Sequence, residues 1–286
     1  MGGIYSNCAL SKVSLSLGVI GLGRMAQALI NPLIERGDFL PESIFGVVGH
    51  KTSIQPALDQ LPKGVRVVDV GDSIANEVWE APLKILAVKP QQLNKIQEQG
   101  NLGTLDDSQR PLLISVIAGV TLKKLQKIFP GHVCVRAVPN TPVLVRAGLT
   151  GVSWGEDVTV DQRTTVKNIF NPISEVLELP EEHLDPFLAL TSSGPAYVAV
   201  IAEALADGAV AAGLSRELSN YLAHRTLAGT ASLLKEKGLH PGQLKDMVAS
   251  PGGTTITALR HLEMAGVRSA LIEAVVAASE RSRELA

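Results

Sequence analysis

The chain has 286 residues, enough for two domains, and 45% of them are hydrophobic, which can supply a substantial core. A formal net charge of −2 gives no electrostatic reason to expect nucleic acid or an acidic membrane surface as a partner. The two cysteines lie far apart without a CxxC pattern, so we expect no disulfide framework, no thiolate metal site and a reducing, cytoplasmic location.

Residues 1–16 contain no acidic side chain and are too weakly apolar for a secretory signal. We therefore expect a disordered or extra N-terminal extension there. The richest apolar stretch, residues 196–214, contains Glu203 and Asp207, so no membrane span is expected. The same two carboxylates share a helix face and could form an acid–base pair, although polar positions on a buried helix are more often structural.

A glycine-rich segment follows the first predicted strand, residues 15–20, and opens an apolar-periodic helix. Gly21 permits a tight turn, Gly23 lets backbone N–H groups approach a ligand, and Ala26 is small enough for helix to pack on strand. This pattern predicts a dinucleotide pyrophosphate at the helix N-terminus. The alternative is a strand-to-helix turn that binds nothing.

Short β-branched runs alternate with helical segments from residue 15 to about residue 140. Their continuous apolar character suits parallel strands covered on both faces, and Thr121 is a predicted helix cap. The pattern predicts an α/β Rossmann domain with a doubly wound, mainly parallel sheet. The expected strands are residues 15–20, 44–48, 65–68, 83–88, 112–117 and 133–138.

The strand signal disappears after Pro180. Before it we expect a strand near residue 149, a helix at 160–170 and a strand at 175–179. Beyond it the expected helices are residues 195–212, 216–237, 241–248, 256–264 and 267–285. The division is therefore a Rossmann NAD(P)-binding domain at 17–180 and an all-α domain at 181–286. Because helix 196–212 is apolar on nearly every face, it predicts a subunit interface, or else the centre of a monomeric bundle.

The turn after the second strand, residues 49–53, indicates which cofactor binds. NAD-binding folds usually place an acid there for the ribose 2′-OH, but this chain has none until Asp59. His50, Lys51 and two hydroxyls could bind a 2′-phosphate instead, which favours NADPH over NADH. An ordinary solvated basic turn is the alternative.

Three further segments could face a ligand. Lys89 and Asn140 follow strands whose carboxyl ends line the crevice of such a sheet, although a surface lysine and a rigid structural turn would look the same. The run from Ser250 to Thr255 holds two glycines ahead of a helix, which suits a carboxylate or phosphate; a capped helix start is the alternative. The six histidines show no metal-ligand spacing, so no metal is expected.

These motifs together resemble the Δ1-pyrroline-5-carboxylate reductase family over residues 17–285. The similarity is carried by residues 18–26, 87–90, 118–121, 136–142, 193–197 and 241–255. The resemblance implies NAD(P)H-dependent reduction of the cyclic imine pyrroline-5-carboxylate to L-proline, by hydride transfer to C5, as the final step of proline biosynthesis. It also implies a homodimer through the helical domain, which family members often assemble into a decamer, a pentamer of dimers.

The resemblance also implies site residues. Those expected to hold the cofactor are Ile20, Gly21, Leu22, Gly23, Arg24, Met25, Ala87, Val88, Lys89 and Pro90, with Ala118 and Asn140 near the nicotinamide. Those expected to hold the substrate are Ser250, Gly253, Thr254 and Thr255, and the Thr255 hydroxyl is the candidate catalytic group near the ring nitrogen. The alternatives are a related small-imine or keto-acid reductase and a non-catalytic NAD(P)-binding regulator.

Overall fold

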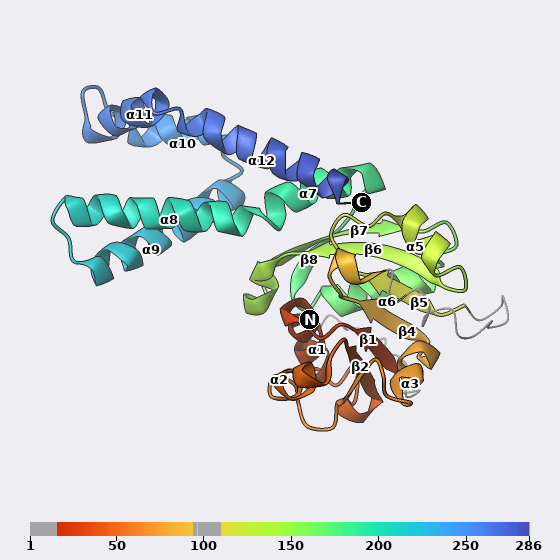
Figure 1. Cartoon of the computed structure of the whole chain (residues 1–286). Helices are drawn as coiled ribbons and strands as arrows, with labels where there is room; N and C mark the ends of the chain where they lie inside the picture. The colour runs from red at the N-terminus through yellow and green to blue at the C-terminus, as the bar shows by residue number, and fades with distance from the viewer. Residues whose placement is uncertain (1–15, 94–95, 97–109, 286) are drawn as a thin grey trace, which may run out of the picture. The chain divides into compact units, whose positions relative to one another are not determined.

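The computed structural model describes residues 16–93, 96 and 110–285, and the expected extension at residues 1–16 lies almost wholly outside them. The chain forms two compact units, Met1–Leu188 with Arg281–Ala286, and Ala189–Glu280 (Figure 1). A compact unit is not by itself an independently folding domain, so the expected division after residue 180 stays a prediction.

The first unit is built on an eight-stranded sheet in the order β3-β2-β1-β4-β5-β6-β7-β8. Strands β1 to β6 pair in parallel, β7 runs antiparallel to β6, and β8 runs parallel to β7. The strands are β1 Leu17–Ile20, β2 Ile44–Val48, β3 Arg66–Asp69, β4 Leu83–Leu86, β5 Leu112–Ser115, β6 Val133–Pro139, β7 Gly148–Trp154 and β8 Ser174–Glu178. The predicted mainly parallel, doubly wound sheet is confirmed.

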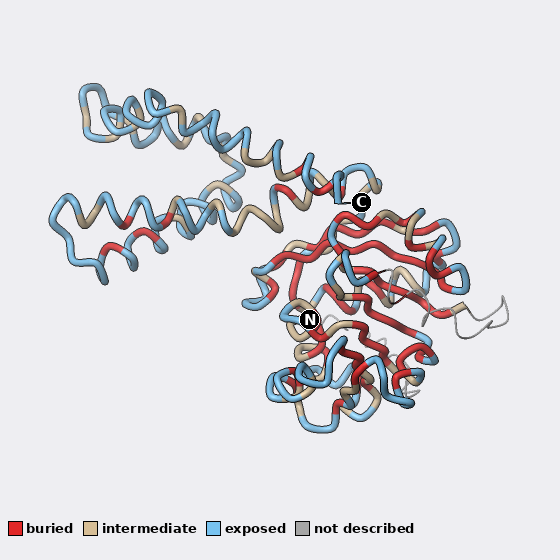
Figure 2. The backbone as a smooth tube through the Cα atoms, in the orientation of Figure 1, coloured by how far each residue is buried: buried red, intermediate tan, exposed pale blue. Residues whose placement is uncertain are grey.

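Every residue of β1, β4, β5 and β6 is buried, which explains why these strands are mostly apolar (Figure 2). Ile20, the last residue of β1, pairs with Val47 on one side and Leu86 on the other. The strand order reverses around β1, since β2 lies on one side and β4 on the other. Ligands of open α/β sheets bind at such a switch point, beyond the carboxyl ends of the strands.

Helices and short 3₁₀ turns connect these strands and follow the last of them. Thr121 caps α5 as predicted, because its Oγ1 accepts a hydrogen bond from the Lys124 N–H at 3.2 Å. The helices are α1 Arg24–Glu35, α2 Ile54–Leu58, α3 Ala75–Glu80, α5 Leu122–Ile128, α6 Val160–Phe170 and α7 Leu184–Thr191. The 3₁₀ turns are η1 Pro41–Ser43, η2 Lys51–Ser53, η3 Pro90–Gln92, η5 Thr141–Val145 and η6 Glu181–His183. Helix α7 was not predicted, and its Pro186 lies in the first turn, where a missing N–H costs no helical hydrogen bond.

The second unit is all-helical, as predicted. Its helices are α8 Gly194–Ala211, α9 Arg216–Lys237, α10 Pro241–Val248, α11 Thr254–Met264 and α12 Val267–Glu284, whose last turn belongs to the first unit. Ser193 is the N-cap of α8 and Pro195 lies in its first turn, so the helix begins one residue before the predicted residue 195. Helix α11 begins at Thr254, earlier than the predicted residue 256.

Most of α8 is exposed or only partly buried (Figure 2). Its exposed residues include the apolar Val198, 50% exposed, and Val200, 65% exposed. The helical stretch Glu181–Ala211 is long and apolar enough to cross a membrane; its most apolar 18-residue window has a mean hydropathy of 1.3 and is 17% buried within the chain. A single such helix is weak evidence for a membrane span. An exposed apolar face of this size is also what a second subunit would cover.

Candidate active site

A cavity of about 700 Å³ lies at the carboxyl ends of β1, β2 and β4. Its walls come from the turns that follow these strands and from the start of α1. The lining residues are Ile20, Gly21, Leu22, Gly23, Gln27, Val47, Val48, Gly49, His50, Thr52, Ser53, Pro56, Ala57, Val70, Ala87, Val88, Lys89, Gln91, Gln92 and Ile96. This is the switch point of the sheet, where a dinucleotide is expected.

The glycine turn after β1 has the predicted geometry. Gly21 has a φ of +90°, its N–H donates to the Val47 carbonyl at 2.9 Å, and a Cβ there would lie 2.8 Å from the Ala87 carbonyl oxygen. Only glycine combines that φ with this approach of β4. Gly23 is the N-cap of α1, and a Cβ there would meet no described atom within 4 Å, while Ala26 is fully buried against the sheet.

The cavity fits a phosphorylated dinucleotide. Among the described residues no side chain caps the first N–H groups of α1, so they are free to bind a pyrophosphate at the positive end of the helix. None of the described lining residues is acidic, whereas Lys89 is a cation and His50 can accept a proton. Thr52 and Ser53 supply hydroxyls beside His50. These groups suit a 2′-phosphate better than a free ribose hydroxyl.

Several expected cofactor residues do not line this cavity, namely Arg24, Met25, Lys51, Pro90, Ala118 and Asn140. Three glutamines that sequence reasoning missed do line it. Gln27 Nε2 donates to the Leu22 carbonyl at 3.0 Å, and Gln92 Oε1 accepts from the Lys89 N–H at 3.2 Å. The available signal for Gln27 was its position four residues after Gly23, on the same face of the helix.

Ala118 and Asn140 lie beyond the carboxyl ends of β5 and β6. Ala118 is exposed between buried neighbours, so it forms the tip of its loop. Asn140 is only 5% exposed, and its Oδ1 accepts a hydrogen bond from the Leu149 N–H at 2.8 Å. This side chain therefore helps fix the start of β7, and its expected role near the nicotinamide stays a prediction.

The glycine-rich segment before α11 forms a concave run of backbone. Gly252 has a φ of +67°, and the Gly253 N–H donates to the Ser250 carbonyl at 3.0 Å. A side chain at Gly253 would collide with Ser250 Oγ. Gly253 is the N-cap of α11, and no described side chain caps this helix. Its first N–H groups, with the hydroxyls of Thr254 and Thr255, therefore form a site suited to a carboxylate.

Two other arrangements considered from the sequence were a Glu203–Asp207 carboxylate pair and a metal site. Asp207 lies 2.5 Å from Arg216 in an exposed ion pair, which gives it a partner other than Glu203. Among the described residues, no group of three or more His, Cys, Asp or Glu side chains could hold a metal ion.

The strongly shifted pKa values belong to groups near the amino ends of the strands, away from the cavity. Burial lowers the pKa of Lys84 on β4 to about 8 and raises the pKa of the Cys134 thiol to about 12. Burial, and then the charges of Lys84 and Arg110, lower the pKa of His132 to about 4. These groups bear on stability rather than on the site.

Two family models match the chain. Residues 181–285 match the model described as pyrroline-5-carboxylate reductase dimerisation. Residues 16–119 match the model described as NADP oxidoreductase, coenzyme F420-dependent. The first match covers the helices from α7 to α12, and the second covers the sheet from β1 to β5.

Curated relatives and solved structures agree with these matches. Pyrroline-5-carboxylate reductase of Synechocystis sp. is 44% identical over 274 residues, 96% of this chain and 99% of the relative. The enzyme of that name from Escherichia coli is 37% identical over 94% of this chain and 97% of its own. The structure of Plasmodium falciparum pyrroline carboxylate reductase with NADP bound superposes with a TM-score of 0.81, at 29% identity, over 95% of this chain and 98% of that one.

Proposed function

This chain belongs to the pyrroline-5-carboxylate reductase family and reduces Δ1-pyrroline-5-carboxylate to L-proline with NADPH, and we propose which of its residues carry that reaction. The observation that carries the assignment is 44% identity over 96% of the chain to a reductase of that name. The glycine-led starts of α1 and α11 supply the two anion sites that the reaction requires.

NADPH supplies, when bound, the hydride that reduces the imine carbon C5. We assign its pyrophosphate to the backbone from Ile20 to Met25, its 2′-phosphate to His50 and Lys51, and its nicotinamide half to Ala118 and Asn140. Residues 87–89 form the wall next to the glycine turn, and Pro90 follows them. His50 lines the cavity directly; Lys51 does not, so its part is the longer-range attraction of a cation for the phosphate.

Ser250, Gly253, Thr254 and Thr255 are assigned to the substrate. Free N–H groups at the start of α11 bind its carboxylate, since an anion is stabilised at a helix N-terminus. The Thr255 hydroxyl is assigned to the ring nitrogen, where it can hydrogen-bond and hold a proton. An iminium carbon is already electrophilic, so these residues mainly orient the ring and exclude water.

The chain carries the family's dimerisation segment, and a homodimer that binds a small-molecule substrate follows from it. Beyond the dimer we propose a decamer built as a pentamer of dimers, working in the cytoplasm without nucleic acid or membrane partners. The net charge of −2 and an apolar helix that a second subunit would cover support this proposal.

The assay follows NADPH oxidation by the purified protein with pyrroline-5-carboxylate, with small keto acids and without substrate. Oxidation that depends on pyrroline-5-carboxylate is the expected result. Oxidation only with a keto acid would identify a related reductase, and oxidation with none would identify a regulator. The cofactor preference is tested by measuring kcat/KM with NADPH and with NADH in parallel. Equal values for the two cofactors would contradict a preference for NADPH.

Thr255→Val tests the assignment at the ring nitrogen. Loss of one transition-state hydrogen bond should reduce kcat by about tenfold or more. Thr257→Val is the matched control, because Thr257 lies within the first turn of the same helix and its Oγ1 donates to the Gly253 carbonyl at 3.0 Å. Near-normal turnover in Thr255→Val would remove Thr255 from the mechanism.

A further inference from the structure

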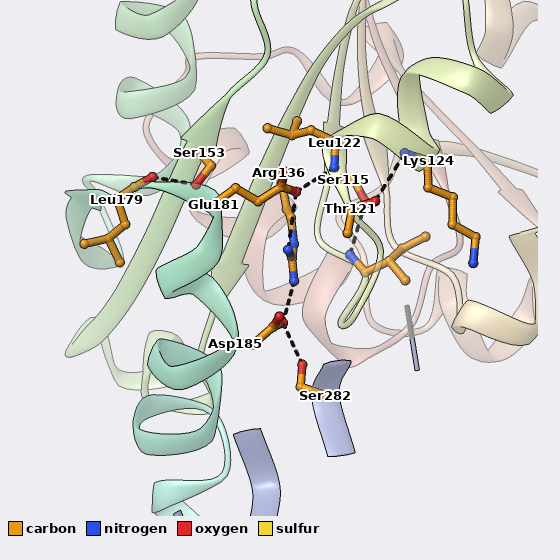
Figure 3. A network of polar contacts seen from close by, with 11 residues as sticks. Ser115, Thr121, Leu122, Lys124, Arg136, Ser153, Leu179, Glu181, Asp185 and Ser282 are labelled. Carbon is orange, nitrogen blue, oxygen red and sulfur yellow. Dashed lines mark hydrogen bonds and ion pairs between the residues drawn. The ribbon is translucent and has the colours of Figure 1, made fainter. Parts of the chain in front are cut away.

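A buried arginine joins three separate segments of the first unit (Figure 3). The Arg136 side chain on β6 is 1% exposed, with Nη1 3.4 Å from Glu181 Oε1 and Nη2 2.9 Å from Asp185 Oδ1. Ser282 Oγ donates to the same Asp185 oxygen at 2.9 Å. A buried guanidinium is costly unless it is paired, so this arrangement fixes both carboxylates and, through Asp185, the end of the chain.

The end of the chain lies directly against the loop that follows β5. Ser282 is 3% exposed, and it belongs with residues 281–286 to the same compact unit as the sheet. Gly119 has a φ of +73°, and a Cβ there would lie 2.9 Å from the Ser282 carbonyl oxygen and 3.0 Å from Leu285 Cβ. The last turn of the chain therefore leaves room only for a glycine at residue 119.

The same cluster holds this loop at its other end. Glu181 Oε1, which pairs with Arg136, accepts a hydrogen bond from the Leu122 N–H at 2.6 Å, at the first residue of α5. Ala118, which precedes both attachments, is exposed, while the neighbouring Gly119 is buried. Arg136 is thus connected to the loop at Gly119, directly after the exposed Ala118, and again at Leu122.

Ala118 lies where the nicotinamide half of the cofactor is expected to reach. This step of the argument rests on the proposed function. The pyrophosphate is assigned to Gly21 and Gly23 beyond β1, and the 2′-phosphate to His50 beyond β2. The other half must then extend in the opposite direction, across β4 towards β5. Adjacent strands lie about 4.8 Å apart, so β5 is about 10 Å from β1, within reach of that half.

We propose that Arg136, Asp185 and Ser282 are positioning residues that hold the Ala118 loop for the nicotinamide, with the last turn of the chain pressed on Gly119. None of the three is assigned a contact with the cofactor. Their effect passes through the backbone of residues 118 and 119. The C-terminal turn is thereby part of the cofactor site rather than a tail of the helical unit.

Ser282→Ala tests this positioning role, because it removes the hydrogen bond to Asp185 without adding a larger side chain. We expect kcat to fall about five- to tenfold, the loss that corresponds to one hydrogen bond of ordinary strength. We also expect NADPH affinity to fall about threefold while the affinity for adenosine 2′,5′-bisphosphate, which lacks the nicotinamide, stays unchanged. Ser282→Thr keeps the hydroxyl and should restore both, and Arg283→Ala on the exposed side of the same turn is the control.

A second variant, Gly119→Ala, displaces the loop directly by adding a methyl group. It should likewise lower the affinity for NADPH and leave the affinity for adenosine 2′,5′-bisphosphate unchanged. The deuterium isotope effect on kcat with NADPH labelled at C4 should rise in both variants, since hydride transfer becomes slower relative to other steps. The proposal would be overturned if both variants had the wild-type kcat and NADPH affinity. It would also be overturned if the affinities for NADPH and for adenosine 2′,5′-bisphosphate fell by the same factor. A wild-type protein inactive on pyrroline-5-carboxylate would contradict the proposed function instead, because the binding comparison needs no turnover.

Discussion

Replacing Gly21 by alanine should lower the stability of the first unit even when no cofactor is bound. The φ of +90° at this position is unfavourable for a residue with a Cβ, at a cost of about 1–2 kcal/mol. The new Cβ would also lie 2.8 Å from the Ala87 carbonyl oxygen, and relieving such a contact in a packed interior costs about 1–3 kcal/mol. The two costs together are about 3 kcal/mol.

Gly23→Ala is the matched control, since the chemistry of the substitution is identical two residues away. Gly23 has an ordinary φ of −74°, and a Cβ there would meet no described atom within 4 Å. The methyl group would instead occupy space beside the free N–H groups of α1, where the pyrophosphate is assigned. Stability should be kept, and NADPH affinity should fall by about tenfold or more, or about 1.4 kcal/mol.

The assay is thermal unfolding of the cofactor-free proteins, followed by titration with NADPH. For a unit of this size about 3 kcal/mol corresponds to a Tm lower by about 10 °C in Gly21→Ala, while Gly23→Ala should melt within about 2 °C of the wild type. Equal melting temperatures for the two variants would refute the reasoning. So would a Gly23→Ala variant that binds NADPH as tightly as the wild type.

Two further predictions concern pH and assembly. The pKa of His132 is about 4 in the folded chain against about 6.5 unfolded, so the unfolded state binds more protons between these values and stability is lost as pH falls from about 6.5 to about 4. His132→Leu should therefore reduce the difference in unfolding free energy between pH 7.0 and 4.5, measured in urea, by about 2 kcal/mol, and an unchanged difference would contradict this. Val200→Glu should convert the dimer to monomer in sedimentation, because it places a charge on the exposed apolar face of α8. Leu40→Glu, at an equally exposed residue of the first unit, should stay dimeric; dimers in both variants would show that α8 is not the interface.

The strands of the parallel sheet could be predicted because burial on both faces leaves a local signature. Runs such as residues 44–48 are apolar throughout, and β2 occupies the same residues. The ends of strands were less predictable. Residues 87–88 continue the apolar run of β4, but the strand ends at Leu86, where the chain turns towards the cavity.

The Arg136 cluster could not have been predicted. Glu181, Asp185 and Ser282 are all distant in sequence from Arg136, and no spacing rule connects them to it. An arginine inside an apolar strand signals only that some partner must exist. Gly18 is a similar case, because a Cβ there would collide with the Val78 carbonyl oxygen, a contact set by how α3 packs on β1.

The two candidate binding sites share a helix start that has glycine at the N-cap and no capping side chain, in contrast to the helices that a side chain caps. Thr121, Thr159 and Ser215 each cap their helix with a side-chain oxygen. Gly23 and Gly253 stand at the same position in α1 and α11, and no described side chain replaces the missing cap. A capping side chain contributes about 1 kcal/mol, so its omission is a cost unless something else satisfies the N–H groups. A bound pyrophosphate and a bound carboxylate would do so, which links the composition of these two turns directly to the reaction.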